Sequence, residues 1–380
     1  MEASCDPRDY VIATLGTHSA LQILKGARDE GMRNLVVCKR GKEQPYRNFG
    51  VADGILPVDD WTDWDLPLEE ELLRRNAIVI PHGSFVAYIG CERVLSMRPM
   101  YYGSKDILRW EADRRLQRRW LERAGLLLPR VFDRPEDIDR PVIVKFHGAS
   151  GGFGYFIVNS PEQFFEVKEK KYPEQEDFVI QEYIVGVPLY VHYFFSPLTG
   201  EIEIMSMDKR YESNADSIGR IRAADQLAAN IYTSYTIVGN IPVTVRESLL
   251  PELFAMGERV VRASRELMDP VTGERVRTGL HGPFCLEAIV TRKLEMYVFE
   301  ISARIVAGTN PYIAGSPYTA LKYDVPMSTG RRVAREIRLA IGQGRLEEVV
   351  EGVDIPPPGG RGLGEGIRYI ENSSKPLLYQ

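Results

Sequence analysis

Residues 142–158, which read VIVKFHGASGGFGYFIV, contain two short apolar segments joined by a loop with four glycines. The β-branched and aromatic residues at 142–145 and 155–158 predict two strands of a hairpin. Lys145 ends the first strand, and the glycine loop lets backbone N–H groups approach phosphate oxygens while the ammonium balances their charge. The loop lacks the spacing of a Walker A loop and leads into a strand, so no helix N-terminus holds the phosphate. An ordinary glycine-rich turn is about equally compatible with this stretch alone.

The N-terminal part of the chain alternates strand and helix patterns. We expect strands at residues 10–15, 34–38, 54–58 and 77–80, and a helix at 20–31 after the first strand. Right-handed connections between such strands give a small parallel sheet with helices on its faces. His18, His82 and Ser84 lie just beyond the carboxyl ends of two of these strands, where open α/β sheets bind ligands. We therefore favour a binding role for these residues over a capping role.

The remainder of the chain mixes helices and strands. Residues 106–124 read as one long helix closed by Gly125, whose arginines are more typical of a solvated face than of a phosphate site. Strands are expected at 178–183, 189–195, 202–207, 284–290 and 294–301, with a helix at 249–268. The tail from residue 352 is rich in proline and glycine and is expected to be peripheral.

Two glutamates interrupt neighbouring apolar strands. Glu287 and Glu300 each lie inside an apolar run, where an unpaired buried charge would cost several kcal/mol. Two converging carboxylates need a cation, and Mg2+ held by one or two carboxylates and substrate phosphates suits them. A pair of edge glutamates pointing to water is about equally compatible with the pattern. Farther upstream, residues 181–186 leave a strand toward a glycine and could offer backbone groups to an adenine edge.

Composition limits the function. The chain has 380 residues, 48 Lys and Arg against 53 Asp and Glu, and a net charge of -5, so we expect no nucleic-acid partner. We also expect no membrane span, because the apolar runs are too short, and the N-terminus lacks a signal-peptide pattern. These features predict a cytoplasmic protein. Cys5, Cys38, Cys91 and Cys285 show no C-x-x-C pairing and predict neither a disulfide framework nor a zinc site.

Taken in order, Lys145 with its glycine loop, Glu182 and the Glu287/Glu300 pair resemble the ATP-grasp superfamily. A closer resemblance, over about residues 8–345, is to the archaeal formate-dependent FAICAR synthetases of purine biosynthesis. It rests on the stretches at 16–27, 81–85, 208–214, 239–242 and 302–304, which read GTHSALQILKGA, PHGSF, DKRYESN, GNIP and SAR. The resemblance implies an α/β and α+β protein, an ATP-grasp fold behind an N-terminal parallel α/β domain.

This resemblance also implies an activity, an ATP-dependent carbon–nitrogen ligation. The family joins formate to 5-aminoimidazole-4-carboxamide ribonucleotide (AICAR), with formyl phosphate as intermediate. Carried over by position, His18, Ser84 and Asn240 bind AICAR, and Lys145 and Arg304 act in catalysis. Glu287 and Glu300 hold Mg2+ or Mn2+. The ATP-binding residues are Lys145, Gly151, Gly152, Glu182, Ile184 and Glu212. The family likeness further implies a homo-oligomer, a trimer or hexamer.

The domain division that follows has four parts: an N-terminal α/β substrate-binding domain at 1–100, a linker helix and small ATP-grasp lobe at 101–180, a large lobe with the metal site at 181–350, and a tail at 351–380. Two alternatives stay open. His147, Ser150 and Phe153 in the loop, and Val306-Ala307 after Arg304, leave room for a ligase that joins a different carboxylate to a different amine. A nucleotide-binding regulator without catalysis is less compatible with two retained glutamates.

Overall fold

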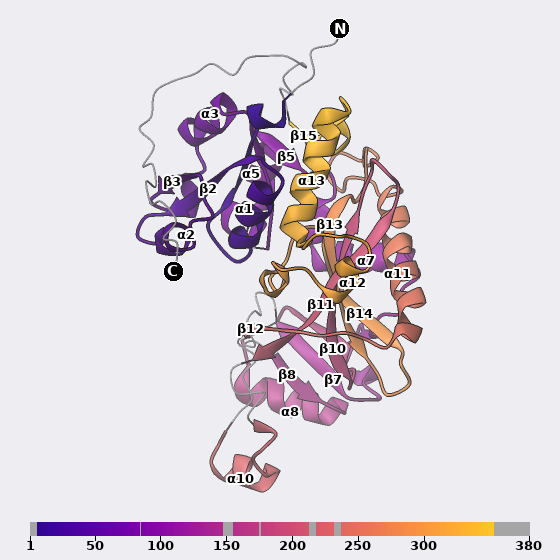
Figure 1. Cartoon of the computed structure of the whole chain (residues 1–380). Helices are drawn as coiled ribbons and strands as arrows, with labels where there is room; N and C mark the ends of the chain where they lie inside the picture. Colours follow the sequence, from indigo (N-terminus) through magenta and orange to yellow (C-terminus); the bar gives the residue numbers. More distant parts are fainter. Residues whose placement is uncertain are drawn as a thin grey trace, which may run out of the picture.

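The computed structural model describes residues 6–83, 85–146, 155–174, 176–212, 218–231 and 237–352. These residues form three sheets, with strand orders β15-β5-β4-β1-β2-β3, β6-β9-β7-β8 and β12-β11-β10-β13-β14 (Figure 1). The division at residues 100, 180 and 350 remains a proposal, since β5 (Met100–Tyr102), β9 (Phe178–Glu182) and β15 (Val350–Glu351) each cross one of these boundaries. The tail beyond residue 352 and most of the glycine loop lie outside the described residues.

The first sheet is the parallel sheet that the sequence predicts. β1 to β5 run parallel, and only the short β15 pairs in the antiparallel sense. Helices pack around this sheet because its central strands are apolar on both faces. The elements are β1 (Val11–Leu15), α1 (Ala20–Asp29), β2 (Arg33–Lys39), α2 (Gln44–Asn48), β3 (Gly54–Val58), α3 (Leu66–Arg74), β4 (Ala77–Val79), α4 (Phe85–Ile89), α5 (Cys91–Ser96), β5 (Met100–Tyr102) and β15 (Val350–Glu351).

The predicted hairpin around the glycine loop belongs to the second sheet, which is antiparallel. Its strands are β6 (Val131–Phe132), β7 (Val142–Phe146), β8 (Tyr155–Val158) and β9 (Phe178–Glu182), and α8 (Pro161–Lys171) covers one face. Phe146, Phe156 and Phe164 form the core beneath α8. Because side chains alternate along a strand, Lys145 points to the opposite, open face of this sheet.

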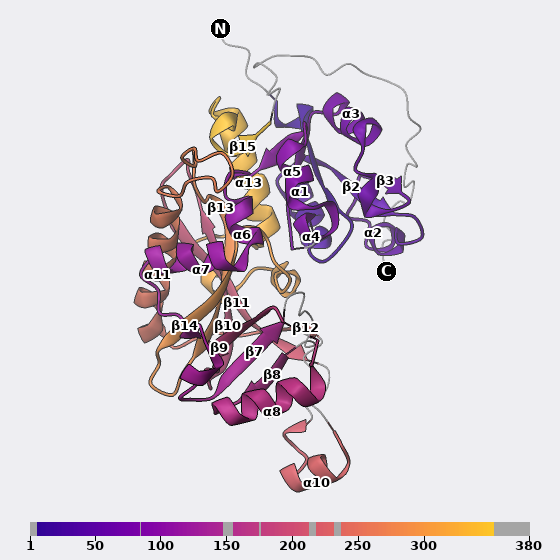
Figure 2. The same ribbon diagram turned by 180° about the vertical axis from the view of Figure 1, so that it is seen from behind.

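The third sheet is larger and also antiparallel. One of its faces packs on α7 and α11 through a core that includes Val191, Met207 and Leu286 (Figure 2). The elements of this part are β10 (Val187–Phe195), β11 (Ile202–Glu212), α10 (Ala223–Ala228), β12 (Ile237–Pro242), α11 (Leu250–Ser264), β13 (Gly282–Val290), β14 (Met296–Ser302), α12 (Pro317–Ala320) and α13 (Thr329–Gly342). β11 extends five residues beyond its predicted end at residue 207, which brings Asp208 and Arg210 into the sheet.

The prediction of one helix over residues 106–124 is wrong. Two helices, α6 (Leu108–Ala112) and α7 (Arg114–Arg123), meet at Asp113, whose backbone is extended with φ -103° and ψ 121°. The Asp113 carboxylate accepts hydrogen bonds from the N–H groups of Arg115 and Leu116 at 2.8 and 3.0 Å. An aspartate that caps a new helix in this way competes with helix continuation.

The sequence pattern favours a solvated face for the arginines of α7 over a phosphate site, and two of these arginines contact neighbouring side chains. Arg118 pairs with Glu122 at 2.9 Å, and the guanidinium of Arg123 lies over the Trp110 ring at 5.8 Å. Exposed pairs of this kind contribute little to stability. Arg114, at the start of α7, differs because its charge acts on Lys145.

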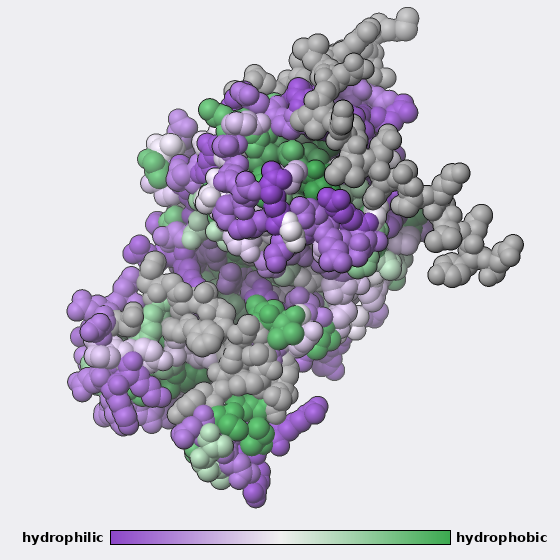
Figure 3. All heavy atoms as spheres, turned by 90° about the vertical axis from the view of Figure 1, so that its left-hand side faces the viewer, coloured by the Kyte–Doolittle hydropathy of each residue, from purple (hydrophilic) through white to green (hydrophobic). Residues whose placement is uncertain are grey.

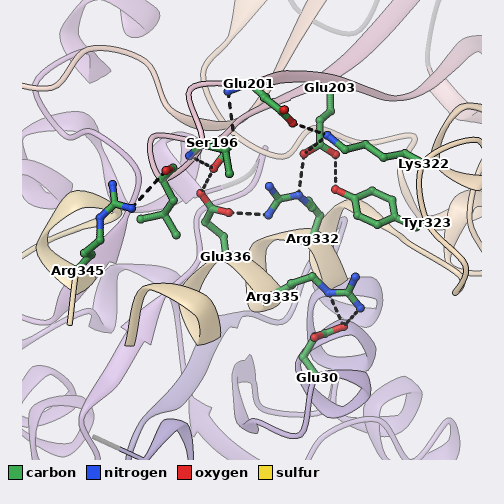
Figure 4. A network of polar contacts seen from close by, with 12 residues as sticks. Glu30, Ser196, Glu201, Glu203, Lys322, Tyr323, Arg332, Arg335, Glu336 and Arg345 are labelled. Carbon is green, nitrogen blue, oxygen red and sulfur yellow. Dashed lines mark hydrogen bonds and ion pairs between the residues drawn. The ribbon is translucent and has the colours of Figure 1, made fainter. Parts of the chain in front are cut away.

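Helix α13 joins the first sheet to the large sheet (Figure 1). It crosses α1 at two glycines, because a Cβ on Gly26 would lie 2.2 Å from the backbone N of Arg331, and one on Gly330 would lie 2.5 Å from the Gln22 carbonyl oxygen. Beside this crossing, a network of ion pairs ties α1, β11 and α13 together (Figure 4). Close packing and this network hold the N-terminal sheet at a defined place beside the large sheet.

Helix α10 stands away from the three sheets (Figures 1 and 2). The segment around it exposes Ile221, Leu227 and Ile231, with Leu227 79% exposed. Figure 3 shows apolar surface at this end of the molecule. Within the part of the chain that the structure describes, no helix is both long and apolar enough to cross a membrane.

Candidate active site

One face of the large sheet is polar across all five strands. The register aligns Tyr190 of β10 with Asp208 of β11 on one side and with Glu287 of β13 on the other. Glu287 in turn lies opposite Glu300 of β14, and Arg210 of β11 lies opposite Asn240 of β12. Because opposite residues on paired strands point to the same side, these side chains share the face that α7 and α11 leave uncovered.

The two glutamates differ in exposure. Glu287 is 3% exposed, whereas Glu300 on the edge strand is exposed. Burial and then the charge of Glu300 raise the pKa of Glu287 to about 8, and the Arg210 guanidinium opposes both effects. Arg210 donates to Glu287 Oε1 at 2.9 Å and stacks on the Tyr190 ring at 4.1 Å. The expected convergence of the carboxylates is present, and the water-facing alternative holds for Glu300 alone.

A cavity of about 570 Å³ opens over this face and brings predicted residues from distant segments together. His18 comes from the loop after β1, Asn240 from β12 and Arg304 from the segment after β14. The residues of interest in the lining are His18, Arg210, Asn240, Glu287, Glu300, Ser302, Arg304, Val306, Ala307 and Gly308. The cavity therefore lies between the loops of the first sheet and the polar face of the large sheet.

Arg304 is held in this cavity by an acid that the sequence did not point out. Its Nη2 lies 2.9 Å from Oε1 of Glu111, a buried residue of α6. Burial raises the pKa of Glu111, and the Arg304 charge lowers it. On the other side, burial and then the Arg304 charge lower the pKa of His18. His18 is thus kept neutral near pH 7, when it can either donate or accept a hydrogen bond.

His82 does not take the binding role expected for it. Its side chain is fully buried, and Nε2 lies 3.0 Å from the Leu15 carbonyl oxygen and 3.4 Å from Thr17 Oγ1. Burial lowers the pKa of His82 to about 4. This histidine stabilises the loop that carries His18, because it contacts the last residue of β1 and Thr17 in that loop.

Lys145 faces the same region from the small sheet. Its ammonium donates to Gln181 Oε1 at 3.0 Å. Burial and the Arg114 charge lower the Lys145 pKa, and the Glu300 carboxylate raises it. The influence of Glu300 places the lysine within electrostatic reach of the carboxylate pair. Three apolar side chains, Ile143, Ile157 and Val179, lie beside Lys145 on the open face of the small sheet.

The other residues expected to bind ATP divide into described and undescribed ones. The Glu182 carboxylate accepts from the Arg130 N–H at 3.1 Å and from Arg140 at 3.2 Å, so its charge is already engaged at the end of β9. Ile184 follows β9 and is half-buried, and Glu212 at the end of β11 helps to raise the pKa of Tyr190. Ser84, Gly151 and Gly152 lie outside the described residues, as do His147, Ser150 and Phe153.

Three site residues were missed as functional candidates: Glu111, Asp208 and Arg210. A signal for the last two was present, since the alternation of Asp208, Arg210 and Glu212 continues the period of a strand after residue 207. Glu111 carries no such signal, because charged residues are frequent in the arginine-rich segment around it.

The donor set at Glu287 and Glu300 fits a divalent metal that also binds a ligand. Two facing carboxylates supply hard oxygen donors, and burial and then the Glu300 charge raise the pKa of Glu287, two effects that a bound cation would offset. Among the described residues, no cluster of three or more His, Cys, Asp or Glu side chains could hold a metal ion. A metal at this pair would therefore depend on further oxygens, and phosphates suit Mg2+.

The arrangement of the three sheets also occurs in solved structures. The ADP complex of purK, an N5-carboxyaminoimidazole ribonucleotide synthetase, matches with a TM-score of 0.61 at 15% identity, over 89% of this chain and 79% of that chain. At this identity the likeness concerns the fold alone. The fold is that of the ATP-grasp class, as the sequence resemblance implied.

Closer relatives define the family. The chain is 55% identical over 345 residues to the 5-formaminoimidazole-4-carboxamide-1-(beta)-D-ribofuranosyl 5'-monophosphate synthetase of Pyrococcus horikoshii. The matched segment covers 89% of this chain and 99% of that protein. The chain belongs to this family of synthetases. The protein of the same name from Methanopyrus kandleri is 50% identical over 355 residues, 91% of this chain and 96% of that protein.

Further comparisons agree with this membership. An IMP biosynthesis protein PurP from Thermococcus kodakaraensis has a TM-score of 0.67 at 30% identity, over 90% of this chain and 100% of that chain. The model of a domain of unknown function, DUF1297, matches residues 162–351, and that of a protein of unknown function, DUF1246, matches residues 12–132. The resemblance to the FAICAR synthetases is confirmed.

Proposed function

We propose that this chain is an ATP-dependent carbon–nitrogen ligase that formylates AICAR with formate, giving FAICAR, ADP and phosphate on the route to IMP. The observation that carries the proposal is the cavity in which His18, Asn240 and Arg304 meet the Glu287/Glu300 pair. Membership of the synthetase family supports the substrates. A site with both a carboxylate pair and nearby cationic groups suits phosphoryl transfer, which depends on positioning and charge stabilisation.

In the first step, a formate oxygen attacks the γ-phosphorus of ATP, and the bond to the β,γ-bridging oxygen breaks to give formyl phosphate and ADP. Lys145 and Arg304 offset negative charge on the transferred group. In the second step, the AICAR amine attacks the formyl carbon, and the C–O bond to phosphate breaks as the nitrogen loses a proton. Neither step needs a covalent bond to the enzyme.

Glu287 and Glu300 would hold Mg2+, or Mn2+ in its place. When bound, such an ion neutralises phosphate charge and orients the phosphoryl group. The glutamates themselves set the position of that ion through the register of β13 and β14, which places them directly opposite each other. Arg210 limits their repulsion through its hydrogen bond to Glu287 at 2.9 Å.

The ATP would lie between the small sheet and the large one. Ile143, Ile157 and Val179 offer an apolar surface for the adenine ring. The Glu182 N–H already donates to the Arg130 carbonyl oxygen at 2.7 Å, so at the end of β9 the backbone of Ile184 would supply hydrogen-bonding groups for the adenine edge beside Glu182. Lys145 with Gly151 and Gly152 would bind the phosphates, and Glu212 the ribose side of the nucleotide. Ser84 would join His18 and Asn240 on AICAR.

Isotope-traced turnover tests the proposal. ATP, labelled formate and AICAR are incubated with the enzyme, and ADP and labelled FAICAR are measured together. Equal yields of ADP and labelled product are expected. A second candidate is ligation of another carboxylate, because Val306 and Ala307 line the cavity and Val306 packs with Tyr190 and Cys285 in an apolar cluster. ADP release with a larger carboxylate but not with formate would replace the first candidate by the second.

We also propose that the protein forms a homo-oligomer, a trimer or hexamer. The exposed Leu227 within α10 gives apolar surface that a second copy could cover. Light scattering of the purified chain measures the mass directly. A monomer at micromolar concentration would contradict this part of the proposal.

A further inference from the structure

A buried aspartate lies beneath the cavity and connects three strands. Asp208 of β11 is 0% exposed. Its Oδ1 lies 2.5 Å from Nε2 of His192 on β10, and its Oδ2 lies 2.5 Å from Nδ2 of Asn240 on β12. His192 is buried as well, whereas Asn240 lines the cavity. The three side chains form a continuous path from the sheet interior to the cavity wall.

The cavity wall also makes room for this aspartate. Gly308 lines the cavity with φ +99°, and a Cβ at this position would lie 2.6 Å from Asp208 Oδ2. Any other residue would push against the carboxylate or displace it from Asn240. The backbone therefore approaches the Asp208 side chain from the cavity side as closely as glycine permits.

The hydrogen bonds fix which way the Asn240 amide points. Nδ2 of Asn240 donates to Asp208 Oδ2, so the NH2 nitrogen of the amide faces the aspartate. The Asp208 Oδ1 atom accepts from His192 when the imidazole proton is on Nε2. Within the described part of the chain, the other amide atom of Asn240, Oδ1, accepts no hydrogen bond, so it is the group left for a ligand.

We infer that His192 and Asp208 are positioning residues that orient the amide of Asn240 so that its Oδ1 accepts a hydrogen bond from an N–H group of the amine substrate. The inference rests on the proposed function, in which Asn240 binds AICAR, and assigns the chemistry of that contact. The site selects a ligand with an N–H donor at this point. A ligand with only acceptors would meet an oxygen that repels it.

The test measures AICAR and ATP binding by calorimetry, without turnover. Asp208→Leu keeps the branched shape but removes both acceptors, so the Asn240 amide can turn. We expect about tenfold weaker AICAR binding, the size of one lost hydrogen bond, and ATP binding within about twofold of wild type. Asp208→Asn should rescue affinity to within about threefold, because an imidazole ring can accept as well as donate and so leave the Asn oxygen to Asn240.

A double-mutant cycle separates this role from a structural one. Asp208→Leu should have no further effect on AICAR affinity when Asn240→Ala is already present. Equal losses in both backgrounds, or unchanged AICAR affinity in Asp208→Leu, would overturn the inference. Ser206→Ala, a buried change two residues away on β11, is the matched control and should leave AICAR affinity unchanged.

A second variant covers failure of Asp208→Leu to fold. Adding His192→Phe to Asp208→Asn removes the ring nitrogen that fixes the new amide, so AICAR binding should fall several-fold relative to Asp208→Asn alone. An unchanged affinity would overturn the inference. If the wild-type protein binds AICAR and all variants bind it equally well, this inference fails and the proposed function stands. If the wild-type protein does not bind AICAR, the proposed function fails.

Discussion

Two regions of the molecule bury charged side chains, and they differ in how the charges are balanced. In the network at α13, Arg332 donates to Glu203 at 3.0 Å and to Glu336 at 2.7 Å, and Ser196 donates to the second glutamate (Figure 4). On the polar face of the large sheet, two glutamates share one arginine, and Glu287 meets the charge of Glu300.

The two regions differ in whether their acids need a partner from outside the chain. Each acid of the α13 network has cationic or hydroxyl partners within the chain, so no ligand is needed to balance it. The Glu287/Glu300 pair shares one arginine, burial and the Glu300 charge raise the pKa of Glu287 to about 8, and the pair adjoins a cavity. Burial of charge alone does not identify function, since a closed network and an open site both have it. A buried carboxylate pair with too few cationic partners, next to an accessible cavity, does indicate a functional site.

The largest expected effect is on the closed network. Arg332→Met should lower the free energy of unfolding by about 3–5 kcal/mol, because it leaves Glu203 and Glu336 buried without their partner. Urea unfolding measures the loss. Lys322→Ala, which removes a half-exposed cation that also pairs with Glu203, is the control and should cost about 1 kcal/mol or less. Equal losses for both variants would show that the network is not closed around Arg332.

Glu300→Gln tests the open site. The change keeps the shape but removes one of the two charges proposed to hold the metal, so kcat should fall by about a hundredfold or more while the melting temperature stays close to wild type. Formate-dependent ADP release measures the activity. Turnover near wild type in excess Mg2+ would remove Glu300 from the metal site.

The third effect concerns the rim of the first sheet. His18→Ala should weaken AICAR binding about tenfold and ATP binding much less, because His18 lines the cavity from the loop after β1, whereas Lys145 approaches from the small sheet. Separate titrations of the two ligands measure this. A larger loss for ATP than for AICAR would contradict the assignment.

The smallest effect is a pH dependence at Glu287. Its pKa of about 8 in the folded chain exceeds the ordinary value of 4.5, so this group lowers the free energy of unfolding as pH rises through that interval. Mg2+ binds the ionised carboxylate and must displace a proton at low pH. Excess MgCl2 should therefore raise the melting temperature by a few degrees more at pH 8.5 than at pH 6.

Glu287→Gln supplies the control for this pH dependence, because the amide does not titrate in the range. The Mg2+ effect on its melting temperature should be small and the same at both pH values. An equal Mg2+ effect at pH 6 and pH 8.5 in the wild type would separate Glu287 from the metal.

Much of the fold could be predicted from the sequence, because short local patterns indicate the strands and helices. The β-branched runs predicted β7 and β8 of the glycine-loop hairpin, and the alternating strand and helix pattern predicted the parallel first sheet. Glu287 and Glu300 were also visible as charges inside apolar strands. Each of these signals lies within a few residues of chain.

Contacts between residues far apart in the chain could be seen only in the folded structure. Glu111 reaches Arg304 from nearly two hundred residues away, and Asp208 reaches Asn240 across a strand pair, so no local pattern could reveal either contact. The extension of β11 to Glu212 likewise depends on pairing with β12, whereas the break at Asp113 is a local capping effect. Strand register and the close crossing of α1 and α13 arise from packing between distant segments, which turns separate charges into one site.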